Sequence, residues 1–285
     1  MGNIIYITLE YFFVYSFLGW CAEVVYQAVE KGLVVNRGFL NGPICPIYGI
    51  GVLTVFRVLE AAGTGSLYRQ NALMIFAFGV VLASCIELVG GWTLGKLFHA
   101  RWWDYSNQPL NFHGYICLKF SIIWGLCILM TVRGVNPLIT KALGLMPRHL
   151  GWALLIIMSA AFIADVIISV LVVTGLNRQM EEIDEMRSRM RTVSDDLSKR
   201  IGENALETAQ RMEGVKLQAA LAKAEVRDQA DDFVDAYEER KRKLLSRLRS
   251  TRHFGMGRLL RAFPDVQHRA HEELLEILKQ ENIMK

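Results

Sequence analysis

The 285-residue sequence lacks the cysteine pattern of a disulfide-stapled or metal-binding protein. It has five Cys and no C-x-x-C pair. Each Cys lies in or beside an apolar run, where Cys usually serves as a small buried hydrophobic residue. The sequence also lacks a strong excess of one charge: its net charge is +4, too small and too evenly mixed to favour nucleic acid. We therefore expect no metal, no cofactor and no nucleic-acid partner.

Three further motifs are missing. The N-terminus lacks the basic region of a cleavable signal peptide, so we expect the first apolar run to remain as a membrane anchor. Gly90–Lys96 has the spacing of a phosphate loop, but Leu97 stands where the Mg²⁺-binding Ser or Thr belongs. His268 and His271 would share one face of a predicted last helix, but no further metal ligands lie near them in the sequence. We conclude that this chain carries no ATPase motif, and we identify no catalytic residue.

Charge is distributed very unevenly along the chain. Residues 1–175 hold ten Lys or Arg and seven Asp or Glu, whereas the remaining 110 residues hold 22 and 21. The first part is membrane-like in composition, and the second is nearly neutral and densely charged. We predict a transmembrane domain over 1–175 and a charged helical cytosolic domain over 176–285.

Long apolar runs predict an all-α, polytopic membrane helix bundle. A span needs roughly 20 mostly apolar residues, and about five segments meet that need. They are Ile4–Ala28, Pro43–Ala61, Ala72–Leu94, Gly114–Val132 and Leu150–Leu171. An odd number of spans puts the termini on opposite sides of the cell membrane. Basic residues near the loops then favour an outer N-terminus and a cytoplasmic tail.

The stretch Val35–Gly49, VNRGFLNGPICPIYG, interrupts the apolar pattern between the first two spans. Its Gly and Pro residues prevent a continuous helix. Such a broken hydrophobic segment is a pointer to a binding site in a membrane protein. A tight interfacial turn before an ordinary span explains the stretch equally well, and both interpretations stay open. Asn36 and Arg37 are the polar candidates here.

Three acidic residues lie inside apolar runs, and each has small neighbours one helical turn away. Because ionisable groups in a bilayer are costly unless they are paired or hydrated, they indicate either a functional polar site or structural ion pairs. The acids are Glu23, Glu87 and Asp165, and the available basic partners are Arg57 and Lys119.

The segment Ala100–Gly114 contains Trp102, Trp103 and Asp104. The Trp pair is typical of an aromatic belt at the membrane interface. Asp104 could bind a ligand, so we add it to the polar-site candidates Glu23, Asn36, Arg37 and Glu87.

The tail shows a helical stripe near the heptad period, with apolar residues every three or four positions from Leu176 to Ile201. We predict a coiled coil over 176–250 and a short helix over 268–283. The stripe fits a helical hairpin within one chain or a parallel coiled coil between two copies. Basic residues 240–243 could touch anionic lipid or form a solvated helix face.

Four phrases together resemble a known bacterial membrane family: YSFLGWCAEVVY (15–26), NRGFLNGPICPIYG (36–49), WWDYS (102–106) and NFHGYICLKFSIIWG (111–125). The family is described as "Putative ABC-transporter type IV", or CmpB-like, and the resemblance covers about residues 5–135. It implies a permease-like membrane protein, with no substrate or catalytic residues to carry over. The charged tail lies outside the resemblance.

These observations favour a permease-like component that binds or moves a small solute. Five spans are few for a complete path, so we expect a homo-oligomer or a partner subunit, including a separate ATPase. Two alternatives stay open. One is a membrane-embedded enzyme for a lipid-linked substrate, using Asp104, His113, Glu23 and Arg37. The other is a membrane scaffold that acts through its tail.

Overall fold

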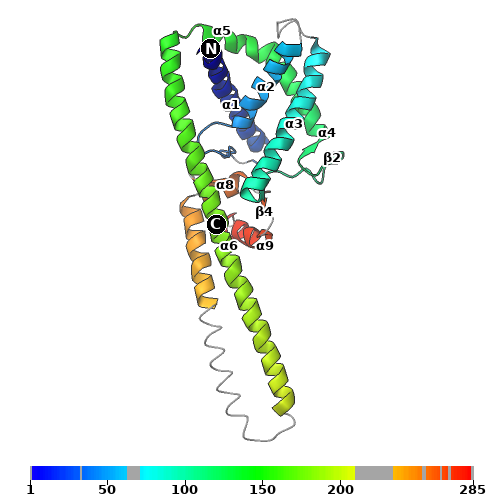
Figure 1. The fold of residues 1–285 in the computed structure, drawn as a ribbon, viewed down its shortest axis with the longest axis vertical. Helices are drawn as coiled ribbons and strands as arrows, with labels where there is room; N and C mark the ends of the chain where they lie inside the picture. Colours follow the sequence, from blue (N-terminus) through cyan, green and yellow to red (C-terminus); the bar gives the residue numbers. More distant parts are fainter. Residues whose placement is uncertain are drawn as a thin grey trace.

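The computed structural model describes residues 2–32, 34–62, 71–208, 234–251, 255–263, 265–268 and 271–283. Over these residues the structure is mainly helical, as the apolar runs predict. A bundle of helices occupies one end of the molecule, and one long helix runs beside the bundle and extends far beyond it (Figure 1).

The elements follow in chain order. The helices are α1 (Gly2–Lys31), α2 (Pro46–Ala62), α3 (Ala72–Phe98), α4 (Leu118–Met130), the π-helical turn η2 (Thr131–Val135), α5 (Asn136–Gly144), α6 (Arg148–Thr208), α8 (Met256–Ala262) and α9 (Glu272–Ile283), with a further helix over 234–250. The strands are β1 (Ala100–Arg101), β2 (Asn111–Phe112), β3 (Ile116–Cys117) and β4 (Gln267–His268). The four short strands were not expected from the sequence.

Four helical stretches among the described residues are long and apolar enough to cross a membrane: Gly2–Val29, Ala72–Phe98, Leu118–Gly144 and Arg148–Arg189. α2 has 17 residues. At 1.5 Å per residue it rises only about 26 Å, less than the roughly 30 Å of a bilayer's hydrocarbon core. The fifth predicted span is therefore not confirmed, and it stays a prediction.

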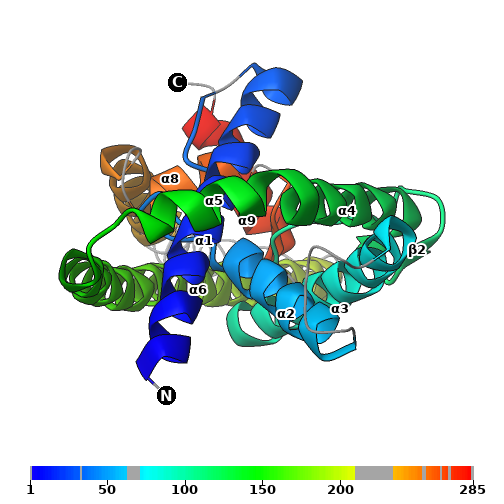
Figure 2. The ribbon, with the colours of Figure 1, turned by 90° about the horizontal axis from the view of Figure 1, so that it is seen from above.

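The stretch Leu118–Gly144 bends instead of continuing as one rod. η2 follows α4 directly, and Pro137 lies in the first turn of α5. A π-helical turn and a proline are both common causes of a sharp helix kink. α5 consequently lies across the end of the bundle (Figure 2).

α1 packs between α2 and α6. Tyr15 of α1 meets Phe56 of α2 edge to face, with ring centroids 5.6 Å apart. Phe13 of α1 meets Phe162 of α6 in the same way at 6.0 Å. Such aromatic pairs add to the stabilisation that burial itself provides. α1 thereby connects α2 with α6.

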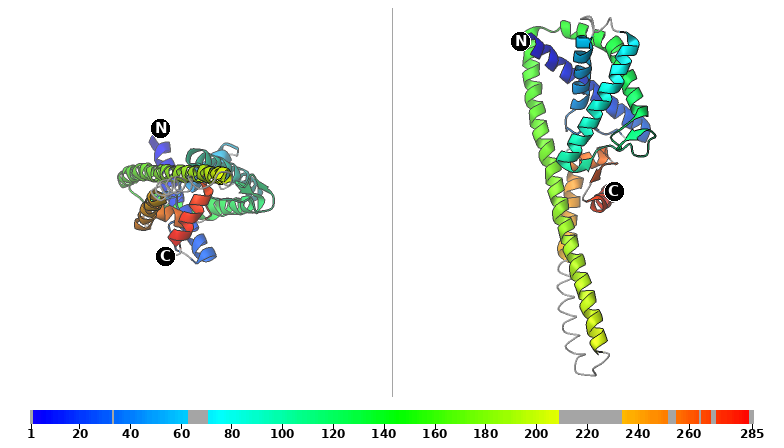
Figure 3. Two further views of the ribbon diagram at one scale, coloured as in Figure 1. Left: turned by 90° about the horizontal axis from the view of Figure 1, so that it is seen from below. Right: turned by 45° about the vertical axis from the view of Figure 1, so that its right-hand side comes forward.

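α6 continues without a break through the predicted domain boundary at residue 175. The helix over 234–250 runs back beside it (Figures 1 and 3). Met180 and Ile183 of α6 share one buried apolar cluster with Leu244 and Leu248. The described residues thus form an intramolecular helix pair. The predicted coiled coil over 176–250 is not confirmed, and residues 209–233 of it lie outside the described residues.

The end of the tail attaches to the membrane part of the chain. β4 pairs with β1 in antiparallel register, Ala100 opposite His268 and Arg101 opposite Gln267. The rings of Trp102 and Phe263 meet edge to face at 5.0 Å. The described residues of the tail are therefore docked onto the end of α3, which the sequence did not predict.

Candidate functional site

The interrupted segment between α1 and α2 is closed by the Asn36 side chain. Asn36 Oδ1 accepts hydrogen bonds from Trp20 Nε1 at 2.7 Å and from the Gly38 amide at 3.0 Å. Asn36 Nδ2 donates to the Asn41 carbonyl oxygen at 2.6 Å. Asn side chains commonly stabilise turns in this way. The Asn36 side chain therefore stabilises the turn, with both its Oδ1 and its Nδ2 engaged in these hydrogen bonds.

Asp165 of α6 holds the same segment from the other side. Its Oδ2 accepts from the Gly42 amide at 2.7 Å, and its Oδ1 accepts from the Asn41 amide and from Asn41 Nδ2, each at 3.0 Å. Hydrogen bonds to an ionised acceptor are stronger than neutral ones. Neutral donors of the interrupted segment therefore bind this carboxylate, and among the described residues neither Arg57 nor Lys119 forms an ion pair with it.

Glu23 lies in the second half of α1 and contacts both a cation and a phenol. Arg37 Nε is 3.4 Å from Glu23 Oε2, and Tyr48 Oη donates to Glu23 Oε1 at 2.5 Å. Gly19, one turn before Glu23, makes room for the Tyr48 ring: a Cβ at Gly19 would lie 2.2 Å from Tyr48 Cγ. The glycine thus allows α2 to approach close enough for Tyr48 to reach Glu23.

Glu87 of α3 is 8% exposed and is the most enclosed acid among the predicted site residues. Tyr105 Oη donates to Glu87 Oε1 at 2.9 Å. Glu87 Oε2 is buried without a hydrogen bond of standard geometry, although the Trp124 side chain lies close enough to interact with the carboxylate. Burial and the neighbouring Glu87 raise the pKa of Tyr105 far above its usual value of 10.0, so the phenol remains a donor.

Aromatic rings connect the two acids. The rings of Tyr48 and Trp124 meet edge to face at 5.7 Å, and Tyr105 stacks on Phe120 at 4.8 Å. Tyr48 therefore touches Glu23 on one side and Trp124 on the other. We call the set Glu23, Arg37, Tyr48, Glu87, Tyr105 and Trp124 the polar cluster. The structure brings together the predicted residues Glu23, Arg37 and Glu87.

Sequence reasoning missed three members of the polar cluster: Tyr48, Tyr105 and Trp124. An available signal was an aromatic side chain with a polar tip inside or beside an apolar run, because such a group usually finds a hydrogen-bond partner when buried. In an apolar run that signal is hard to separate from an interfacial aromatic residue.

Asp104 is next to the polar cluster in sequence but belongs to a local turn. It accepts from the Ser106 amide at 3.0 Å and from Ser106 Oγ at 2.6 Å, and it lies 3.2 Å from Arg101 Nη1. Partial burial opposes its ionisation, but the Ser106 hydrogen bonds and Arg101 lower the pKa of Asp104 overall. The structure thus separates Asp104 from Glu23 and Arg37, with no hydrogen bond or ion pair joining them among the described residues.

Arg57 and Lys119 do not pair with the acids, which corrects the expectation from the sequence. Arg57 is exposed on α2, bonded to Thr8 at 2.8 Å and lying 3.4 Å from Glu60. Lys119 is exposed at the start of α4, with its Nζ 5.7 Å from the Phe120 ring centroid. A long basic side chain can reach the bilayer surface and stay hydrated there, so it needs no buried partner.

Arg258 of α8 is a further residue that the sequence did not single out. Its guanidinium donates to the carbonyl oxygens of Asn36 at 3.0 Å, Gly38 at 2.8 Å and Phe39 at 3.1 Å. The Gly255 amide also donates to Asn41 Oδ1 at 3.2 Å. Burial lowers the pKa of Arg258 from 12.5 to about 10. The tail therefore docks directly on the segment that carries Arg37.

These features define a membrane protein with acidic and aromatic side chains gathered inside a helix bundle. Ionisable groups in that setting are typical of transport proteins. The family model described as "Putative ABC-transporter type IV" matches residues 10–170. The chain belongs to this family, which confirms the resemblance and extends it into α6 as far as Asp165 and Ser169. Comparisons with curated proteins and with solved structures gave no match.

Proposed function

We propose that the chain is the membrane component of an ABC-type transporter and that the polar cluster binds the transported solute. The observation that supports this proposal most strongly is the link from Glu23 through Tyr48 and Trp124 to Glu87, two acids on different helices. Polar groups this expensive to bury are seldom kept inside a membrane bundle without a function. The interrupted segment carrying Arg37 lies against Glu23, as binding sites beside broken helices do.

The proposed topology has five passes: α1, α2, α3, α4 and α6. Successive members of this series run in opposite directions in Figure 1, and the N-terminus and the tail lie at opposite ends. The basic residues of the loops favour an outer N-terminus and a cytoplasmic tail. The polar cluster then lies toward the cytoplasmic half, beside the docked tail. α2 is short for a full span, so we propose that protein rather than lipid surrounds its ends.

The proposal requires an ATPase on a separate polypeptide. Affinity purification of the tagged full chain in mild detergent, followed by mass spectrometry, should recover a stoichiometric ATPase subunit. Recovery of the chain alone, as a defined oligomer, would overturn the ABC-type assignment.

The solute site is tested on the recovered complex in proteoliposomes. We expect Glu87→Gln and Glu23→Gln to lower its ATPase activity at least tenfold without reducing the amount of ATPase subunit that co-purifies. Glu60→Gln is the matched control, because Glu60 is an exposed acid on α2 whose ion-pair partner is Arg57. Wild-type ATPase activity in both cluster variants would refute the site and leave the subunit assignment standing.

A further inference from the structure

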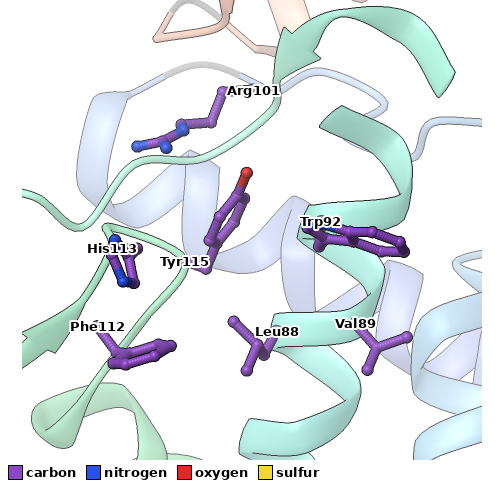
Figure 4. Close-up of a pocket in the computed structure, with 7 residues that line it drawn as sticks. All are labelled: Leu88, Val89, Trp92, Arg101, Phe112, His113 and Tyr115. Atoms are coloured by element: carbon purple, nitrogen blue, oxygen red, sulfur yellow. The ribbon is translucent and has the colours of Figure 1, made fainter. Parts of the chain in front are cut away.

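A groove of about 610 Å³ lies beside the C-terminal half of α3. One wall is α3 itself, with Leu88, Val89 and Trp92, and the other is the β2–β3 hairpin, with Phe112 and His113. Arg101 lies at one end of the groove, whereas Leu88, Val89 and Phe112 lie toward the other (Figure 4). The groove is therefore amphipathic along its length. It contains no member of the polar cluster.

The apolar end of the groove faces outward. Val89 is 60% exposed, Trp92 is 53% exposed and Phe112 is 54% exposed. Val89 and Trp92 belong to one of the apolar membrane-spanning stretches. In a bilayer such side chains contact acyl chains, and Trp favours the depth of the lipid headgroups.

Two cations near the groove already contact aromatic rings: Arg101 lines the groove, and Lys96 lies one helical turn beyond the lining residue Trp92 on α3. Lys96 Nζ lies 5.0 Å from the Trp92 ring centroid, and the Arg101 guanidinium lies 4.7 Å from that of Tyr115. Because these rings are occupied by the protein's own cations, they do not form a cage for the quaternary ammonium of a choline headgroup. Asp104 neutralises part of this charge through Arg101. One net positive charge is left, which matches a single phosphodiester.

The hairpin wall is fixed in place by local hydrogen bonds. Asn111 Nδ2 donates to the carbonyl oxygens of Ser106 at 3.1 Å and Gln108 at 2.8 Å, and Asn111 Oδ1 accepts from the Gly114 amide at 3.1 Å. His113 has a φ of 51°, a left-handed conformation that costs energy in a residue other than glycine. A wall held in this way needs no ordering when a ligand enters, which favours binding.

We propose that this groove binds one anionic phospholipid of the cytoplasmic leaflet. The phosphodiester lies near Lys96 and Arg101, and an acyl chain follows Leu88, Val89 and Phe112 toward the membrane interior. Basic pockets on the cytoplasmic side of membrane helices bind anionic headgroups in this way. The proposal does not depend on what the polar cluster transports.

The test is a native mass-spectrometry titration of the full chain in detergent, with dioleoylphosphatidylglycerol and dioleoylphosphatidylcholine as probes. The wild-type protein should bind the first phosphatidylglycerol at least tenfold more tightly than phosphatidylcholine. Lys96→Gln and Arg101→Gln should each weaken the binding of phosphatidylglycerol about fivefold, because one basic residue near an anionic lipid contributes about 1 kcal/mol. Asp104→Asn should strengthen it, because it removes the compensating negative charge. Phosphatidylcholine binding should not change in any of these variants.

Two variants separate groove binding from general surface attraction. Lys119→Gln removes an exposed cation outside the groove and should leave both lipids unaffected. Val89→Trp fills the apolar end without changing the charge, and it should abolish the selective phosphatidylglycerol site. Equal affinity of the wild-type protein for the two lipids would overturn the proposal. So would an effect of Lys119→Gln as large as that of Lys96→Gln, or unchanged phosphatidylglycerol binding in Val89→Trp.

Discussion

The contact between Arg258 and the interrupted segment permits a quantitative prediction about docking of the tail. Arg258→Met removes the guanidinium and keeps a long side chain. Three hydrogen bonds link Arg258 to carbonyl oxygens of this segment. At about 1.5 kcal/mol each, the lower end of the range for charged donors, they contribute roughly 4.5 kcal/mol.

Burial of the charge opposes this gain. The lowering of the Arg258 pKa from 12.5 to about 10 corresponds to about 3 kcal/mol. Removing the guanidinium loses this net gain of between 1 and 2 kcal/mol. It also leaves the buried carbonyl oxygen of Gly38 unpaired, which costs about 1 kcal/mol more. We therefore expect Arg258→Met to destabilise the docked tail by about 2 kcal/mol, which is a roughly 30-fold larger undocked fraction.

Hydrogen–deuterium exchange of the full chain in detergent measures this fraction directly. Amides in peptides covering 255–263 should exchange roughly 30-fold faster in Arg258→Met, because local opening governs their protection. Arg258→Lys should give a smaller acceleration, since an ammonium group cannot reproduce the planar fork of a guanidinium. Arg261→Met, on the same helix, is the matched control. Exchange in Arg258→Met no faster than in Arg261→Met would refute the reasoning.

Two further predictions concern stability. Gly19→Ala should lower the stability of the bundle by about 2 kcal/mol, because the new Cβ would lie 2.2 Å from Tyr48 Cγ. Thermal unfolding in detergent measures this loss of stability. Gly51→Ala is the control and should melt like the wild type, because a Cβ at Gly51 would meet nothing within 4 Å. Equal melting temperatures of the two variants would contradict the close contact between Gly19 and Tyr48. The pKa of His268 is lowered from 6.5 to about 4 by burial and by the nearby His271 and more distant His99, and Asp184 opposes this shift. The folded protein therefore favours the neutral imidazole. Docking of α9 should therefore weaken by up to about 3 kcal/mol as the pH falls from 6.5 toward 4. The rate of proteolysis of the tail, measured as a function of pH, tests this. The same pH dependence in His268→Gln would show that His268 is not responsible.

The helices were predictable because hydrophobic length is a local property of the sequence. α3 begins at Ala72, as predicted, and α6 begins two residues before the predicted Leu150. α2 begins at Pro46, three residues later than predicted. Proline suits the first turn of a helix, where its missing amide donor costs nothing. Pro43 and Pro46 both allow a helix to start, and the apolar run alone does not distinguish them.

The partners of the buried acids are not predictable from the sign of charge alone. The cations in the apolar runs are Arg57 and Lys119, yet a phenol donates to Glu87 and backbone amides donate to Asp165. A carboxylate needs donors near it rather than a cation as such, and neutral donors are too common in a sequence to single out. Glu23 does lie beside a basic residue, but that residue is Arg37, 14 positions away across a turn, rather than Arg57 or Lys119.

The change in composition at residue 175 predicts a separate domain for the tail. Composition indicates whether a segment is soluble in water or in lipid, but it does not indicate which protein surface the segment contacts. α6 crosses this boundary as one continuous helix. Its Asp165 accepts a hydrogen bond from Asn41, and Asn41 Oδ1 accepts one from the Gly255 amide of the tail. The interrupted segment is therefore held between α6 and the tail. Because Arg37 lies in that segment and contacts Glu23, a displacement of the docked tail would act on the polar cluster through bonded neighbours.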